Sequence, residues 1–461
     1  MSKGLSEKIV REISARKKEP KWMLEFRLKS LRIYNEMPMP NFGPDLSPLK
    51  IDEIESYIKP RQEMVSDWKD VPKDIRKTFT DLGIPQAERA GLAGVGAQFD
   101  SELVYHNVKA AVAHQGVYYD SIENAMHSKY RGMVHQYFMQ LVPPNDHKFA
   151  ALHGAVWSGG SFVYVPPHTS VQFPLQSYFR FNAPGAGQFE HTLIIVDEGA
   201  DLHFIEGCSA PKYNIANLHA GCVEIFVKKN ASVKYSTVEN WSKNMYNLNT
   251  KRALVEAGGK MEWITGSFGS HVSMLYPMAI LNGPNASMEY TGVTFAGGGQ
   301  DLDTGVKVVH NSPRTSSLIN AKSIAKDGGK NTFRSLVKVT GRAKNAKSFT
   351  DCQSLMLDSQ SESNTIPKFD IACSSADVAH EANVGKISET EINYLRTRGL
   401  SEAEARALIV RGFTNDVSKE LPFEYAAEMN NLIRLEMREN MWWQLCRFWR
   451  RIFQISITRT Q

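Results

Sequence analysis

The segment Asn230-Ala231-Ser232-Val233-Lys234-Tyr235 carries the pattern that decides the fold, a turn-forming pair followed by a strand of alternating residues. Similar turn-forming pairs stand at 199–200, 258–259 and 285–286, so that successive marks are about 27 to 31 residues apart. No helical pattern of ~10–15 residues lies between the strands, which argues against a parallel sheet with crossover helices. A coil of short strands with this period is typical of a parallel β-helix, and a β-sandwich is the alternative.

Helical and mixed sequence precedes this repeating region. Residues 1–150 are predicted as an N-terminal helical and mixed region, and residues 151–385 as the β-helix core. The N-terminal region is expected to open with one helix that reaches about residue 36, with Ser6 as its N-cap, and Pro38 stops it.

A second helical pattern follows the core. Residues 386–437 are predicted as a C-terminal helical domain with two capping boxes, at Ser388 and Ser401, and with Gly399 and Gly412 expected to end its helices. Residues 438–461 form a basic, Trp-rich tail, for which membrane-surface binding, an extra packed helix and foreign sequence are the alternatives.

Composition limits the class of protein. Apolar residues make up 42% and charged residues 22% of the 461 residues, as in an ordinary soluble protein. The charged N-terminus and the lack of an 18-residue apolar run predict a cytoplasmic protein and argue against a membrane role. Five cysteines with long, unequal gaps fit reduced thiols better than a disulfide framework. Because +4 of the net charge of +5 lies from Arg438 onward, the body offers no basic stripe for nucleic acid.

Potential metal ligands stand late in the repeating region. Cys352 supplies a thiol, and His380 and Glu381 supply an imidazole and a carboxylate, which are the usual protein ligands of iron and zinc. The alternative is a buried free thiol. Neighbouring residues of a regular strand point to opposite faces, so His380 and Glu381 can both be ligands only if a bulge intervenes. Glu381 is the favoured ligand, with His380 beside it.

Several longer motifs occur in the order found in one family. They are Gln176-Ser177-Tyr178-Phe179-Arg180, Glu206-Gly207-Cys208-Ser209-Ala210-Pro211, Tyr235-Ser236-Thr237-Val238-Glu239-Asn240-Trp241, Asp303-Thr304-Gly305, the stretches around Cys352 and His380-Glu381, and Arg398-Gly399-Leu400-Ser401-Glu402. From near the N-terminus to about Met437 the chain resembles the SufB/SufD family of iron–sulfur cluster assembly scaffolds, on the SufB side.

This resemblance implies a right-handed parallel β-helix flanked by helical segments. It implies as partners the SufC ATPase, docked on the C-terminal helical domain, and the SufD paralogue or a second copy of the chain. A cysteine desulfurase system (SufS with SufE or SufU) would deliver persulfide sulfur, and apo-proteins would receive the cluster. The cluster is expected as [4Fe-4S] or [2Fe-2S], bound transiently; reduced flavin has no readable signature here. No Walker motif is present, so the chain is expected not to be an enzyme and ATP hydrolysis to belong to SufC.

The resemblance also implies roles for single residues. Cys208 corresponds to the sulfur-accepting cysteine, and Cys352, Glu381 and His380 to the cluster-assembly ligands. The residues that correspond to a sulfur path through the β-helix are Arg180, Asn182, Glu239, Trp241 and Lys251. For these five, exposure to solvent or a structural hydrogen-bond network is the alternative.

Spacing adds physical expectations to these roles. Cys208 ends a strand-like run and is expected to be reachable by a sulfur donor. About five rungs separate it from Cys352, or on the order of 24 Å at roughly 4.8 Å per rung, so sulfur would need a relay. A carboxylate at Glu239 is expected to pair with Lys251 or Arg180.

Two other functions compete with a non-catalytic assembly scaffold. One is a β-helix carbohydrate enzyme that uses carboxylates such as Asp301 and Asp303. The other is a SufD-like partner subunit, against which the presence of both Cys208 and Cys352 argues.

Overall fold

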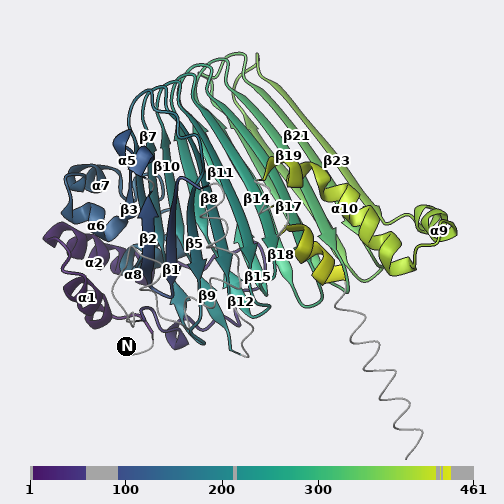
Figure 1. Cartoon of the computed structure of the whole chain (residues 1–461), viewed down its shortest axis with the longest axis horizontal. Coiled ribbons are helices and arrows are strands. Elements are labelled where there is room, and N and C mark those ends of the chain that lie inside the picture. The colour runs from purple at the N-terminus through teal and green to yellow at the C-terminus, as the bar shows by residue number, and fades with distance from the viewer. Residues whose placement is uncertain are drawn as a thin grey trace, which may run out of the picture.

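A long stack of parallel strands forms the body of the protein, with helices at both ends, in a computed structural model (Figure 1). The structure describes residues 4–58, 92–108, 110–210, 215–421, 426 and 429–437. Within these ranges no helix combines the length and the apolar character needed to cross a membrane. The tail at 438–461 lies outside the described residues.

The described strands form two sheets that face each other across the β-helix. The ten-stranded sheet has the order β2 (Glu102–Val108), β1 (Gly94–Phe99), β5 (Leu175–Arg180), β8 (Asp201–Ser209), β11 (Ser232–Asn240), β14 (Lys260–Phe268), β17 (Ser287–Ala296), β19 (Ser316–Ala325), β21 (Lys347–Met356) and β23 (Asp377–Lys386). The 13-stranded sheet contains β3 (Tyr118–Ser121), β4 (Ser161–Val165), β7 (His191–Val196), β10 (Cys222–Val227), β13 (Thr250–Val255), β16 (Met278–Leu281), β18 (Asp301–His310), β15 (Val272–Leu275), β12 (Met245–Asn247), β9 (Asn217–His219), β6 (Gly187–Gln188), β20 (Lys330–Val339) and β22 (Glu362–Ile371). The predicted parallel β-helix is therefore confirmed.

The predicted turn marks are confirmed as well. Gly199, Asn230, Gly258 and Asn285 all have positive φ, between 56° and 66°. Glycine and asparagine tolerate this left-handed conformation better than other residues, which is why they recur at the corner of each rung.

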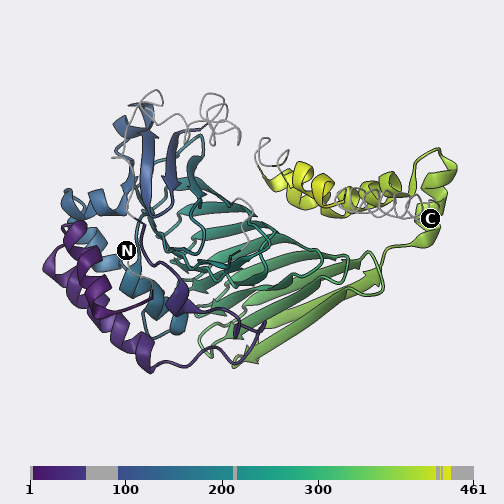
Figure 2. The same ribbon diagram turned by 90° about the horizontal axis from the view of Figure 1, so that it is seen from below.

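The rungs change shape along the stack. In the early rungs the 13-stranded sheet is built from two short strands per rung, such as β12 and β13. The long strand β18 pairs with both β15 and β16, so from that rung onward one ten-residue strand replaces two short ones. The stack therefore flattens toward its C-terminal end, as Figure 2 also shows.

Side chains of alternate residues fill the interior. Phe204, Tyr235, Trp263 and Tyr290 stand on successive strands in register and belong to one buried cluster that runs through the stack. The Phe204 and Tyr235 rings stack with centroids 5.5 Å apart. This inward face fixes the register, because a slip of one residue would turn the aromatic side chains to the opposite face.

The N-terminal region differs from the single helix that was predicted. It contains two helices, α1 (Glu7–Arg16), capped by Ser6 as expected, and α2 (Lys21–Glu36). The prediction of one helix is wrong because Pro20 has no N–H to continue the hydrogen-bond ladder, and Lys18 adopts a positive φ of 51°. The segments η1 (Ile51–Glu53), α5 (Ala110–His114), α6 (Ile122–His127), α7 (Arg131–Tyr137) and α8 (Lys148–Val156) follow.

The C-terminal helices are α9 (Glu389–Thr397) and α10 (Glu402–Glu420). The capping box at Ser401 is complete, and Ser388 accepts from the backbone of Glu391. Gly412 lies inside α10, so the prediction that it ends a helix is wrong, since the apolar contacts of the helix continue beyond it. Through Val410 and Val417, α10 packs on the outer face of the ten-stranded sheet (Figure 1).

Candidate functional site

The last rungs bring a thiol and an imidazole together. Cys352 lies on β21 and His380 on β23, and Cys352 Sγ is 3.4 Å from His380 Nε2. Thr350 pairs with His380 in register, and Cys352 is two residues further along β21, so both side chains lie on the inward face. Burial, with the Asp351 carboxylate adding to it, raises the pKa of the Cys352 thiol to about 12. Burial also lowers the pKa of His380, which favours the neutral imidazole that a metal requires.

Glu381 lies on the opposite face of the same strand. It pairs in register with Asp351 and is exposed, and the β21–β23 ladder runs without a register shift. The bulge that would have turned both neighbours inward is therefore absent from these strands. The structure places His380, rather than the favoured Glu381, beside Cys352.

The end of the stack below these residues is open. Phe369 and Ile371 of β22 and Val384 of β23 point inward, yet their side chains are 41%, 46% and 45% exposed because no described rung covers them. The Phe369 ring stands 6.1 Å from the His380 ring. His380 is thus on the uncovered last rung itself, and Cys352 is one rung from it.

Cys208 lies far from this pair, near the other end of the stack. It is on β8 and is 1% exposed, so the expectation that a sulfur donor can reach it is not met in this conformation. It packs in a cluster with Phe179, Phe181 and Trp241, because its side chain turns into the β-helix. Burial, reinforced by the Glu206 and Glu239 carboxylates, raises the pKa of this thiol well above its usual value.

A buried charge network surrounds Cys208, formed by Glu206, Glu239, Lys251, Tyr235 and Thr237. The Lys251 ammonium donates to Glu206 Oε1 and to Thr237 Oγ1, both at 2.8 Å, and lies 3.9 Å from Glu239 Oε1. Tyr235 donates its hydroxyl to the other Glu206 oxygen. Burial alone would favour a neutral Glu206, but the Lys251 charge and these hydrogen bonds hold its pKa below the usual value.

Glu239 was expected to pair with Lys251 or Arg180, and it lies near Lys251. It approaches Lys251, and Asn247 donates to its second oxygen at 2.7 Å. Burial raises the pKa of Glu239. The Lys251 ammonium, which is shared with Glu206, offsets this effect of burial only in part. Asn247 in turn contacts His219, which pairs with Glu190, so the polar contacts continue across the interior.

Sequence reasoning missed Glu206 and His219. The available signal for Glu206 was its position two residues before Cys208, which places both on one face of the strand. His219 gave no such signal, because it is brought to the network from the short strand β9.

Two residues of the predicted sulfur path lie apart from this network. Arg180 ends β5 and donates to Ser209 Oγ at 2.8 Å, on the face opposite to Cys208. Asn182 follows the strand and is exposed, and its backbone N–H donates to Asp100. Trp241 lies beside Cys208, with its ring 4.7 Å from that of His219.

Residues that pair in register on successive strands lead from one cysteine to the other. Five successive parallel pairings lead from Cys208 to Glu239, Ser267, Thr294, Ser323 and Ser354, and Ser354 is two residues from Cys352 on β21. The predicted separation of about five rungs is therefore confirmed. We call these four buried Ser and Thr residues the hydroxyl ladder.

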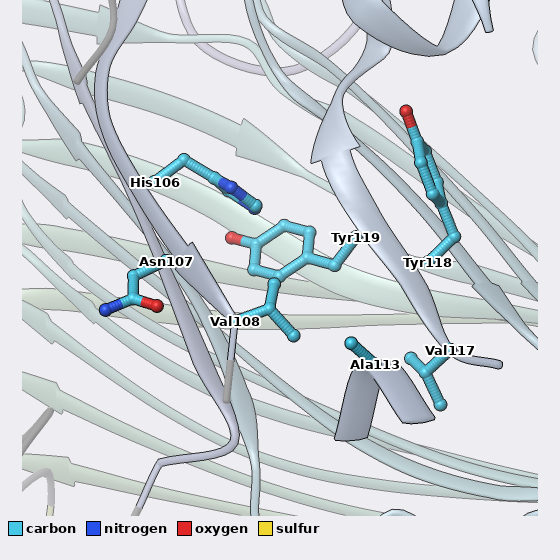
Figure 3. Close-up of a pocket in the computed structure, with 7 residues that line it drawn as sticks. All are labelled: His106, Asn107, Val108, Ala113, Val117, Tyr118 and Tyr119. Atoms are coloured by element: carbon cyan, nitrogen blue, oxygen red, sulfur yellow. The ribbon is translucent and has the colours of Figure 1, made fainter. Parts of the chain in front are cut away.

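Asp303, one of the two carboxylates considered for a carbohydrate enzyme, has other partners. Arg334 donates to both oxygens of Asp303, at 2.8 and 2.7 Å, and Tyr276 donates to one of them at 2.8 Å. Asp303 is thus held in a structural pair. A surface pocket elsewhere contains none of the predicted site residues (Figure 3); it is lined by His106, Asn107, Val108, Ala113, Val117, Tyr118 and Tyr119.

Comparison with known proteins gives consistent matches along the chain. The profile described as SUF system FeS cluster assembly, SufBD core domain, matches residues 179–413, and the SufBD protein N-terminal region matches residues 16–177. An iron-sulfur cluster assembly SufBD family protein of Staphylococcus aureus strain MRSA252 is 49% identical over 435 residues, which cover 94% of this chain and 93% of the relative. A protein of the same description from Staphylococcus haemolyticus strain JCSC1435 is 48% identical over the same shares.

Proposed function

Because the chain belongs to the SufBD family of iron–sulfur cluster assembly proteins, we propose that it is a scaffold of the SufB type. Iron and sulfur would combine on it into a nascent cluster, which then passes to apo-proteins. The observation that carries this proposal is the pair Cys352 and His380 at the open end of the β-helix. A scaffold of this kind would not be an enzyme, and ATP would be hydrolysed by a separate SufC subunit.

The pair offers half of a cluster-binding site. A thiolate and a neutral imidazole are both ligands of iron in clusters. Since the pKa of Cys352 is raised, iron binding would displace its proton, and the cluster would be lost again when the proton returns. Two ligands from one chain hold a cluster loosely, which suits a cargo that must be released. For Glu381 we propose a ligand role secondary to that of His380, because it points to the other face of β23.

The open end supports a second subunit as the other half of the site. The exposed inward-facing residues Phe369, Ile371 and Val384 form an apolar surface that a further rung would cover. We propose that the SufD paralogue, or a second copy of this chain, docks there and completes the cluster site. SufC would dock on α9 and α10, and the complex would act in the cytoplasm.

Sulfur would enter at Cys208 as a persulfide. A persulfide of the desulfurase system (SufS with SufE or SufU) would give its outer sulfur to the Cys208 thiolate and leave as a thiolate. Because Cys208 is buried, the chain around it would have to open for this transfer. We propose that the opening is at the end of β5, where Arg180 and Asn182 lie. The Lys251 ammonium is the cation of the charge network around Cys208 and would offset the charge of the persulfide.

The hydroxyl ladder supports movement of sulfur toward Cys352. Its Ser and Thr groups follow Cys208 and Glu239 in register, and each can donate a hydrogen bond to a passing anionic sulfur. The neighbouring inward positions on the Cys352 side are small, Gly292 and Ala321, but the Tyr290 ring packs against Gly292, so this ring would have to move aside for sulfur to pass. With these contacts we propose Glu239, Trp241 and Lys251 as the entrance of the path.

The test is anaerobic reconstitution of the full chain with iron, sulfide and the SufC subunit, followed by absorbance of the cluster. We expect Cys352→Ala to abolish the cluster and His380→Ala to reduce it strongly, while Glu381→Gln retains more than His380→Ala. Cys373→Ala is the matched control, because this thiol is on the same open end but is not in the pair. Unchanged cluster absorbance in Cys352→Ala would sink the proposal.

A further inference from the structure

Three potential metal ligands meet beneath the N-terminal helices, away from both cysteines discussed above. They are His153 of α8, His191 of β7 and Cys222 of β10, and one ligand atom from each lies within 4.8 Å of the others. All three side chains are buried, with at most 1% exposure. His191 and Cys222 pair in register and point out of the β-helix toward α8. Figure 1 shows α8 against the early strands.

The outer nitrogens of the two imidazoles face different groups. His153 Nδ1 lies 2.9 Å from the carbonyl oxygen of Ala220, and because a carbonyl only accepts, this nitrogen carries the hydrogen. The lone pair of His153 therefore sits on Nε2, which faces His191 Nδ1 at 3.0 Å. His191 Nε2 lies 3.1 Å from the Glu224 carboxylate, at ion-pair distance.

Glu224 is itself fixed in place. Its carboxylate accepts backbone N–H groups from Met139, Leu141 and Val142, at 2.5 to 3.0 Å. A histidine that binds a metal usually directs its other nitrogen at a backbone carbonyl or a carboxylate, which fixes the ring and raises its basicity. His153 has such a partner in the Ala220 carbonyl, whereas His191 Nε2 lies 3.1 Å from the Glu224 carboxylate without the geometry of a hydrogen bond.

We propose that His153 Nε2, His191 Nδ1 and Cys222 Sγ bind a divalent metal ion of borderline softness, for which Zn²⁺ is the reference ion. A tetrahedral zinc site with two nitrogens at about 2.0–2.1 Å sets these nitrogens ~3.3 Å apart. The facing nitrogens, 3.0 Å apart, would have to separate by about 0.3 Å, and the rings would have to turn so that both lone pairs point at the ion rather than at each other. Water would take the fourth position.

Binding exchanges one proton for the ion. Without the ion, a hydrogen on His191 Nδ1 bridges the two rings and Cys222 keeps its thiol hydrogen, whose loss burial disfavours. When the ion binds, the His191 hydrogen moves from Nδ1 to Nε2, on the side of the Glu224 carboxylate, and the Cys222 proton leaves to solvent, so that N–metal and S–metal bonds form at the two freed atoms. Burial lowers the pKa of His153 well below its usual value, so this ligand is already neutral.

The ion would fasten the N-terminal helices to the β-helix. One ligand comes from α8 and two come from neighbouring strands, so the metal would add a link between elements that also meet through side-chain packing and hydrogen bonds. The site lies on early rungs, whereas Cys352 and His380 lie on the last ones. The proposal therefore does not depend on cluster assembly.

The experiment uses the full chain carrying Cys352→Ala, which removes the proposed cluster ligand, after refolding with Co²⁺. We expect one Co²⁺ per chain, with a thiolate-to-cobalt charge-transfer band and the visible bands of a tetrahedral ion. Adding Cys222→Ser should remove the charge-transfer band, while adding Cys373→Ser should leave it unchanged.

X-ray absorption of the Zn²⁺-loaded Cys352→Ala chain needs no substitution of the three proposed zinc ligands. It therefore tests the site even if Cys222→Ser fails to fold. We expect one sulfur at about 2.3 Å and two nitrogens at about 2.0–2.1 Å. Absence of stoichiometric metal, or a charge-transfer band that survives Cys222→Ser, would overturn the proposal.

Discussion

Replacing Lys251 by methionine tests whether the buried charge network around Cys208 is compensated as its geometry indicates. The ammonium is 2.8 Å from Glu206 and 3.9 Å from Glu239, and all three side chains are buried. Lys251→Met keeps the apolar length of the side chain but leaves the Glu206 carboxylate without its cation. Removing one partner of a buried ion pair costs about 3–5 kcal/mol, a large share of the ~5–15 kcal/mol that keeps a protein folded.

The loss should depend on pH in a defined direction. Because the pKa of Glu206 is lowered in the folded protein, its stabilising contribution is present above the pKa of the unfolded chain and is lost as pH falls through the folded value. In the variant, burial without the ammonium raises the pKa of Glu206, so mild acid neutralises it at little cost. The difference in stability between wild type and Lys251→Met should therefore be largest near neutral pH and shrink toward acid.

Urea unfolding of the full chain, followed by fluorescence at several pH values, measures this difference. The double variant Lys251→Met/Glu206→Gln should regain most of the stability at neutral pH, because no uncompensated carboxylate remains at that position. Lys330→Met is the control, since its partner Glu362 is exposed and the pair lies in solvent. A loss below about 1 kcal/mol, or a double variant no more stable than the single one, would refute the compensation argument.

Three further predictions concern other parts of the chain. Hydrogen bonding from Ser375 lowers the pKa of the partly exposed Cys373 thiol, whereas the pKa of the buried Cys352 thiol is raised to about 12. Iodoacetamide at pH 8 should therefore label Cys373 before Cys352 in mass spectra, with Cys352 labelled only as pH rises; preferential labelling of Cys352 would contradict this. Gly292→Ala places a Cβ 2.3 Å from the hydroxyl oxygen of buried Tyr290 and should cost about 1–3 kcal/mol in urea unfolding, where unchanged stability would show that the ring can shift. Ser401→Ala removes the N-cap of α10 and should lower the stability of this helix by about 1 kcal/mol. Amide hydrogen exchange in the first turn of α10 should then be faster, and unchanged exchange would mean that the cap does not stabilise the helix.

Much of the fold follows from local features of the sequence. The period of 27 to 31 residues and the turn-forming pairs predict the β-helix, because each corner needs residues that tolerate positive φ. The capping box at Ser401 predicts the start of α10 for an equally local reason. Gly412 shows the limit of this reasoning, since packing against the sheet carries α10 through a glycine that would otherwise weaken it.

The choice between His380 and Glu381 depended on the exact length of one rung. Residues 350 and 380 pair across a rung of 30 residues, which turns His380 inward beside Cys352. A rung of 29 residues would instead have paired Cys352 with Glu381. The observed period includes both lengths, so the sequence could not decide between the two ligands, although either choice identifies the same region.

The sequence by itself determined the repeating coil, its helical ends, the family and the neighbourhood of the proposed cluster site, because these depend on period, turn residues and motifs of contiguous residues. Only the tertiary structure decided that Cys208 is buried beside Glu206 and Lys251, and that His153 meets His191 and Cys222. These contacts join residues tens of positions apart. They arise from the stacking register of the rungs and from the docking of α8, in which a shift of one residue turns a side chain from one face of a strand to the other.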